Sequence, residues 1–166
     1  MKKQFNNQKR MLESFGDQFL VICPNCSKQA KVLSLGEHQP YQIDVTKRFT
    51  CLQCGLTKDI VPKKNNFNQN KISYEKTFKD GFINIGGAFD WYFGYPLLLQ
   101  IPFREHTFWA YNLKHLQYLK SYIEAELREN HPYYLSVESR LPLWMKSAKN
   151  RDLILKAIIK LELKTK

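Results

Sequence analysis

All four cysteines of the chain occur in two C-x-x-C pairs, Cys23 with Cys26 and Cys51 with Cys54. The two thiolates of one C-x-x-C turn can reach the same ion, and two such turns complete a tetrahedral set of four sulfur ligands that zinc accepts readily. The insert between the pairs is somewhat longer than the usual span of roughly 15–20 residues and leaves room for a hairpin. Because four thiolates leave no open position for water, we predict one structural Zn²⁺ rather than a catalytic one.

The segments around the two pairs have the pattern of a small antiparallel sheet. Residues 18–22 form an apolar run, and residues 30–35 and 41–50 alternate apolar with polar side chains. Gly55 follows the last cysteine, where a turn with positive φ favours glycine. The pattern predicts a zinc ribbon over residues 18–61.

Two other uses of paired cysteines fit this sequence less well. Two disulfides would suit a secreted chain, but residues 1–10 are basic with no apolar segment after them, so we expect no signal peptide. A redox C-x-x-C pair would require a thioredoxin-like βαβ pattern, which surrounds neither pair. We therefore expect reduced cysteines and a cytoplasmic protein.

The whole chain predicts an α+β protein in four parts. Residues 1–17 form a basic N-terminal arm, and the zinc ribbon of residues 18–61 follows it. Residues 62–80, rich in Lys, Asn and Gln, form a linker or long loop, or alternatively a flexible basic segment that touches phosphates. Residues 81–166 form an α+β body with a β-hairpin and two C-terminal helices.

The periodicity of the body changes from β to helical along the chain. Residues 97–103 and 108–111 predict the two strands of the hairpin. Residues 82–103 carry little charge, but Asp90 and several glycines and prolines interrupt them, so we expect strands rather than a membrane span.

Two later segments have helical spacing of their apolar residues. Residues 113–129 predict an amphipathic helix of four to five turns, with Asn112 as its N-cap. A second helix reaches about Leu163, and Asn150 is its predicted cap.

The chain carries a formal net charge of +11, which predicts anionic partners: DNA or RNA, or an acidic protein surface. Charge that serves solubility alone is the alternative. In the C-terminal segment, cations beside Trp144 and a helix start would suit a phosphate, with a solvated helix face as the other interpretation. The predicted phosphate contacts are Lys28, Lys31, Lys47, Arg48, Lys58, Lys146, Lys149 and Arg151.

Two functions fit these features. The first is binding of nucleic acid or a nucleoprotein particle, with exposed aromatic residues such as Trp91 or Tyr92 stacking on bases. The second is a protein–protein adaptor that docks through an aromatic surface of residues 91–99 and uses zinc to hold its fold. The motifs G-x-x-x-x-G-K-[ST], G-x-G-x-x-G and H-E-x-x-H are absent, and His106 and His115 have no catalytic partner at fixed spacing. We therefore assign no catalytic residue.

Three segments of the second half carry a resemblance to a known family. Residues 92–100 (YFGYPLLLQ), 108–116 (FWAYNLKHL) and 140–152 (RLPLWMKSAKNRD) resemble a family of uncharacterised bacterial proteins described as containing a TFIIB-type zinc ribbon. The resemblance covers most of residues 18–163 and implies the ribbon, but no activity. Many members have further cysteines near the hairpin turn, where this chain has Phe, Arg, Glu and His at residues 103–106.

Overall fold

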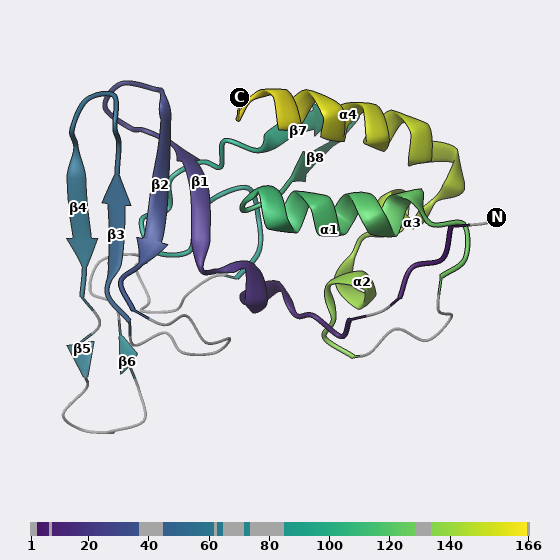
Figure 1. Cartoon of the computed structure of the whole chain (residues 1–166), viewed down its shortest axis with the longest axis horizontal. Helices are drawn as coiled ribbons and strands as arrows, with labels where there is room; N and C mark the ends of the chain where they lie inside the picture. The colour runs from purple at the N-terminus through teal and green to yellow at the C-terminus, as the bar shows by residue number, and fades with distance from the viewer. Residues whose placement is uncertain are drawn as a thin grey trace.

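The computed structural model confirms the α+β class, with a sheet at one end of the molecule and helices at the other (Figure 1). The helices lie on the C-terminal side of the chain, as the change in periodicity predicted. The residues that the structure describes are 3–6, 8–36, 45–61, 63–64, 72–73, 85–128 and 134–165.

The N-terminal strands form an antiparallel sheet of four strands in the order β1-β2-β3-β4 (Figure 1). Strands that are neighbours in sequence are also neighbours in space, which short connections allow. This is the small sheet that the sequence predicted around the cysteines. Its strands are β1 (Gln18–Ile22), β2 (Gln29–Ser34), β3 (Lys47–Thr50) and β4 (Thr57–Ile60).

Strand β1 makes backbone hydrogen bonds along both of its edges. On the edge away from β2, the Leu20 N–H donates to the Tyr111 carbonyl (2.8 Å) and the Leu98 N–H donates to the Leu20 carbonyl (2.9 Å). The Ile22 N–H donates to the Pro96 carbonyl (2.9 Å). Buried residues of the sheet and of the C-terminal half belong to one continuous cluster, so ribbon and body share a core.

Aromatic rings fill the centre of this core. Phe19, Trp91 and Tyr111 contact one another edge to face, with ring centroids 5.0 Å apart in each pair. The Trp91 Nε1–H donates to the Tyr111 hydroxyl at 2.8 Å, which satisfies two polar atoms that burial would otherwise leave unpaired. The prediction that Trp91 or Tyr92 is exposed for base stacking is therefore wrong, because only 2% and 1% of their surfaces are accessible.

The predicted docking surface of residues 91–99 is only partly accessible. Leu97 and Leu99 have no accessible surface, because their segment is hydrogen-bonded to the edge of β1 that faces away from β2. Phe93 and Tyr95 are half-buried and stack on each other (ring centroids 5.5 Å apart), so only this part of the segment remains accessible.

The fully buried carboxylate of Asp90 organises the turn that leads into this segment. Its two oxygens accept the backbone N–H groups of Tyr92 (2.9 Å), Phe93 (2.7 Å) and Tyr95 (2.7 Å). Burial raises the pKa of Asp90, while these N–H donors oppose that rise. The carboxylate therefore satisfies backbone N–H groups of the turn that burial would otherwise leave without a partner.

Two short antiparallel pairs follow the four-stranded sheet. Strands β5 (Lys63–Lys64) and β6 (Ile72–Ser73) pair within the predicted linker, whose other residues lie outside the described part of the chain. Strands β7 (Gln100–Phe103) and β8 (His106–Trp109) form the hairpin that the sequence predicted.

Helix α1 (Leu113–Glu124) begins where it was predicted to begin and ends five residues earlier. The Asn112 side chain caps it by accepting the His115 N–H at 2.9 Å. The Asn112 amide also donates to the carbonyls of Phe15 (2.9 Å) and Gln18 (2.7 Å). One side chain therefore fixes both the helix start and the entry to β1.

The C-terminal segment is divided into more elements than the single helix that the sequence predicted. Asn150 lies at the start of the last helix, but its amide donates to the Trp144 carbonyl (2.9 Å) and does not cap the helix. This last helix packs beside α1 (Figure 1). The elements are α2 (Val137–Arg140), α3 (Leu143–Lys146), the 3₁₀ turn η2 (Ala148–Asn150) and α4 (Arg151–Leu163).

The described part of the N-terminal arm packs against the helical body. Phe5 and Phe15 are buried, and a 3₁₀ turn, η1 (Leu12–Phe15), leads into β1. The Glu126 N–H donates to the Lys3 carbonyl (2.9 Å), which joins the arm to the end of α1. Within the described residues, no helix has both the length and the apolar character needed to cross a membrane.

Candidate metal centre

Each cysteine pair lies in a turn with the same backbone pattern. In the first cysteine turn (residues 23–28), the Ser27 N–H donates to the Cys23 carbonyl (2.9 Å) and the Cys23 N–H to the Lys28 carbonyl (2.8 Å). In the second cysteine turn (residues 51–56), the Gly55 N–H donates to the Cys51 carbonyl (3.0 Å), and the Cys51 N–H is also bonded within the turn. Both turns bring two sulfurs to one side of the backbone.

The left-handed position after each pair is the main difference between the two turns. Gly55 has φ of +72°, as the sequence predicted, and Ser27 has φ of +58° at the corresponding position of the first turn. A side chain at positive φ is disfavoured sterically, so the first turn tolerates strain that the second avoids.

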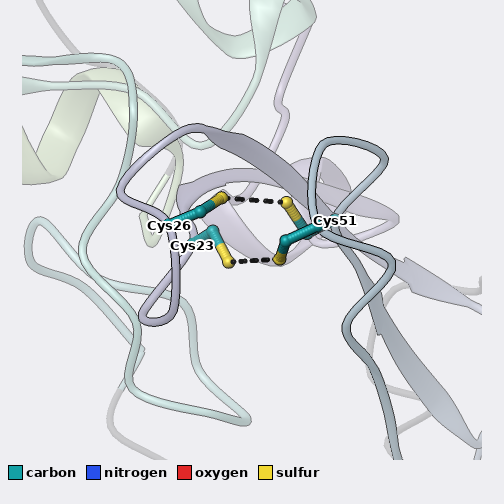
Figure 2. Close-up of side chains that lie close together, drawn as sticks. Cys23, Cys26 and Cys51 are labelled. Atoms are coloured by element: carbon teal, nitrogen blue, oxygen red, sulfur yellow. Dashed lines mark hydrogen bonds between the residues drawn. The ribbon is translucent and has the colours of Figure 1, made fainter.

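The two turns face each other and bring the four sulfurs together (Figure 2). The four Sγ atoms all lie within 4.8 Å of one another. Cys23 Sγ is 3.7 Å from Cys54 Sγ, and Cys26 Sγ is 3.5 Å from Cys51 Sγ. Zn–S bonds of 2.3 Å in a tetrahedron separate neighbouring sulfurs by about 3.8 Å, so the spacing fits a metal of this size.

Burial of the ligands is uneven. Cys23 and Cys51 are buried, Cys26 is half-buried and Cys54 is exposed. The site therefore opens to solvent on the side of Cys54, which gives an ion an entry path. All four cysteines are free thiols and form a candidate metal centre, as their spacing predicted.

The proton affinities of the thiols show why such a cluster needs a cation. The Asn25 side chain and the Leu56 backbone lower the pKa of Cys54 to about 6 by hydrogen bonding. A backbone hydrogen bond at Lys28 favours the Cys26 thiolate, but desolvation and the neighbouring sulfurs outweigh it and raise the pKa of Cys26 to about 12. Several thiolates so close together repel one another, and a bound metal ion compensates that repulsion while releasing the protons.

The five predicted phosphate contacts of the ribbon do not share one surface. Lys28, Lys31 and Lys58 are exposed, whereas Lys47 is only 1% accessible. The Lys47 ammonium donates to Ser34 Oγ (2.6 Å) and lies 4.7 Å from the centre of the Tyr92 ring. Lys47 is therefore a buried structural cation, and the prediction that it contacts phosphate is wrong.

Arg48 is exposed but already has an anionic partner. Its Nε and Nη2 atoms donate to the two carboxylate oxygens of Asp59, each at 2.8 Å. Asp59 raises the pKa of Arg48, and Arg48 lowers the pKa of Asp59. This cross-strand pair between β3 and β4 reduces the charge that Arg48 can offer to a phosphate.

The predicted C-terminal cluster is largely used within the fold. The Lys146 ammonium donates to the Ser139 carbonyl (3.2 Å), and Arg151 Nη2 donates to the Ala125 carbonyl (3.2 Å). Lys149 alone of the three is exposed. The predicted joint phosphate site is therefore not formed, because two of its cations stabilise neighbouring backbone.

Arg128 is a structural residue that the sequence reasoning missed. Its guanidinium donates to the carbonyls of Tyr122 (3.1 Å), Ile123 (3.1 Å) and Lys146 (2.9 Å). It therefore closes the C-terminal end of α1 and joins it to α3. A basic residue just beyond an amphipathic helix is the sequence signal for such a C-terminal cap.

A hollow lined by residues of β2, Thr50, both cysteine turns and Thr165 gathers two of the exposed cations. It has a volume of about 730 Å³ and includes Lys28 and Lys31 in its lining. Gln29, Thr50 and Gln53 add polar groups, and none of the described residues that line it is acidic. We call this surface the sheet hollow.

Comparisons with known proteins leave these features to be judged from the structure alone. No family model, no curated protein and no solved structure matches this chain. The resemblance to the bacterial zinc-ribbon family remains a prediction from the sequence.

Proposed function

We propose that the four cysteines hold one structural Zn²⁺ and that the ribbon binds nucleic acid through the sheet hollow. Support for zinc comes from the all-sulfur donor set and its near-tetrahedral spacing, which suit Zn²⁺ better than hard cations. Four protein ligands complete the coordination sphere, so the ion stabilises the turns and has no position for a reacting water.

The sheet hollow is the observation that carries nucleic-acid binding. Lys28 and Lys31 supply positive charge there, and the glutamine and threonine side chains can donate hydrogen bonds to phosphate oxygens. The absence of acidic side chains from its described lining leaves this charge uncompensated. The overall charge of +11 adds long-range attraction to a polyanion.

Binding to short DNA and RNA at several salt concentrations tests this proposal. For the zinc-loaded protein, the logarithm of the binding constant is expected to fall linearly with the logarithm of the salt concentration, because each neutralised phosphate releases counterions. Changing Lys28→Gln and Lys31→Gln together is expected to reduce the slope by about 1 for each lost contact. Lys156→Gln with Lys160→Gln, which removes the same charge from exposed positions of α4, is the matched control.

An adaptor that binds an acidic protein surface is the second candidate. Leu33 and Leu52, which are 38% and 85% accessible, also line the sheet hollow and could add apolar contact. Recovery of one protein partner in stoichiometric amount, by binding that persists after nuclease treatment and in moderate salt, would favour this function. Absence of nucleic-acid binding at low salt would contradict the first proposal and leave its zinc part unaffected.

A further inference from the structure

A second cavity is lined by residues of η1, β8, α1 and the α2–α3 segment. Its volume is about 260 Å³. The lining is mainly apolar and includes Leu12, Leu119, Trp109 and Trp144. A dry cavity of about 150 Å³ already accommodates benzene, so this space is large enough for a ligand of one or two rings. We call it the indole cavity.

The wall of the indole cavity contains one buried polar side chain with an unused donor. His115 is 2% accessible, and its Nδ1 accepts the Tyr111 N–H at 3.3 Å. That acceptor role places the ring proton on Nε2. Within residues 85–128 and the other described parts of the chain, Nε2 makes no hydrogen bond.

The histidine stays neutral, so its unused group is an N–H donor rather than a charge. Burial lowers the pKa of His115 to about 3, well below neutral pH. Although the residue is buried, its Nε2 atom retains some accessible surface. Because His115 lines the cavity, a bound molecule can reach Nε2. Burying such a donor without a partner is costly, and an acceptor on a ligand removes that cost.

Two indoles form flat walls that their neighbours hold in place. Trp144 stacks on Phe103 (ring centroids 4.9 Å apart) and on His106 (5.1 Å), both from the β7–β8 hairpin. Trp109 contacts His115 edge-on, with centroids 5.9 Å apart. Fixed aromatic walls favour a planar aromatic ligand, because little side-chain freedom is lost when it binds.

A cation lies at the rim of the cavity. Arg140 is exposed and lines the opening, and within the described residues its guanidinium makes no hydrogen bond or ion pair. A guanidinium pairs well with a carboxylate, to which it can donate two parallel hydrogen bonds. The charge at the opening and the N–H donor within both call for oxygen acceptors on the ligand.

We propose that the indole cavity binds a small aromatic carboxylate of one or two rings, with its rings against Trp109 and Trp144 and its oxygens accepting from His115 Nε2–H and paired with Arg140. A nucleobase fits less well, because the apolar lining would leave several of its donors and acceptors without partners. This proposal does not depend on nucleic-acid binding by the sheet hollow, which lies on other elements.

Titration of the zinc-loaded full chain with 2-naphthoate tests this inference. Calorimetry is expected to give one site per chain, and the ¹⁵N resonance of His115 Nε2 is expected to shift with the same saturation curve. The probe 2-methylnaphthalene keeps the rings but lacks the acceptor, so it is expected to bind at least tenfold more weakly. Adenosine monophosphate is expected to bind more weakly than 2-naphthoate.

Two variants locate the site without removing His115, whose loss could also unfold the chain. Leu12→Trp fills the cavity from η1 and is expected to weaken 2-naphthoate binding at least tenfold. Arg140→Gln is expected to weaken it about fivefold, because exposed ion pairs contribute up to roughly 1 kcal/mol. Lys156→Gln removes the same charge from an exposed position of α4 and is expected to leave binding unchanged.

Three results would overturn the inference. Failure of 2-naphthoate to saturate at millimolar concentration would exclude the ligand class. Equal binding by the folded Leu12→Trp variant would place the probe elsewhere on the protein. Tighter binding of adenosine monophosphate or 2-methylnaphthalene than of 2-naphthoate would show that the cavity selects a different chemistry.

Discussion

Strands β1 and β4 belong to the same sheet, but their side chains have opposite surroundings. The three central residues of β1 are buried and both of its edges are hydrogen-bonded. The first three residues of β4 are exposed, and the strand follows a cysteine turn whose Leu52 and Cys54 are also exposed. Apolar burial therefore orders the β1 side of the sheet, whereas the β4 side relies on backbone hydrogen bonds and the cysteine cluster.

This difference shows how a small sheet can combine two sources of stability. The core around Phe19 gains from burial of large aromatic surfaces, each of which contributes a substantial part of a domain's stability. The second cysteine turn has too little apolar surface to be ordered in that way. A bound metal would supply the missing free energy, because the four cysteines come from two separate turns.

Loss of the metal is expected to have the largest effect and to act mainly on the β4 side. Cys51→Ser removes one of the two buried ligands, and the free energy of a structural zinc site in small domains is about 10–16 kcal/mol. Metal content should fall to near zero, and hydrogen exchange should show loss of protection in β3 and β4 before β1. A variant that keeps one equivalent of metal and full protection would contradict a structural site.

Phe19→Ala tests the β1 side directly. Removing a fully buried phenylalanine costs about 3–5 kcal/mol, because it leaves a cavity beside Trp91 and Tyr111. Chemical denaturation of the metal-loaded protein should show this loss, with β1 and the helical body unfolding together. Leu52→Ala, at an exposed position of the second cysteine turn, is the control and should change stability by less than about 0.5 kcal/mol. A loss below about 1 kcal/mol for Phe19→Ala would mean that the aromatic core is not the main source of order.

His115 makes the aromatic side of the molecule sensitive to acid. Its folded pKa of about 3 lies below the ordinary value of 6.5, so the unfolded chain takes up a proton in this interval and the folded chain does not. Stability is therefore retained above pH 6.5 and falls as the pH is lowered toward 3. Between pH 7 and pH 5 this group accounts for about 2 kcal/mol.

Comparison of the wild-type chain with His115→Gln isolates that contribution. Denaturation of both proteins at pH 7 and pH 5, with saturating metal, should show a shallower pH dependence for the variant. Metal loss affects the two proteins equally and cancels in the difference. Identical pH dependence would mean that His115 is protonated, or solvated, in the folded state.

The exposed pair between Arg48 and Asp59 is expected to have the smallest effect. Arg48→Gln should lower stability only slightly, because solvent screens exposed ion pairs. A double-mutant cycle with Asp59→Asn measures the coupling between the two side chains. A coupling as large as the loss caused by Phe19→Ala would show that β4 depends on this pair as well as on a bound metal.

Local patterns in the sequence predicted the cysteine cluster and several element boundaries. The C-x-x-C spacing, the Asn112 cap and the β7–β8 hairpin depend on residues close together in the chain, so the sequence pattern alone predicts them. The early end of α1 was missed because Ala125 is extended for reasons that its own propensity does not reveal.

Features set by distant contacts could not be predicted in the same way. Residues 96–98 and Tyr111 pair with the second edge of β1, and no local pattern indicates that pairing. Its consequence is that Trp91 is buried and not exposed. Lys47 was likewise assigned to the surface because lysine is usually exposed, but Ser34 and the Tyr92 ring accommodate its charge inside.

The double pairing of β1 also sets an order of events during synthesis of the chain. All four cysteines have been synthesised once Cys54 has emerged from the ribosome, but the outer edge of β1 must wait for residues 96–98 and then Tyr111. At roughly 5–20 residues per second, that interval lasts several seconds, during which the edge of β1 is free to pair with another chain. Early binding of a metal would hold the strands of the ribbon in register through this interval, before the segments that pair with the outer edge of β1 have been synthesised.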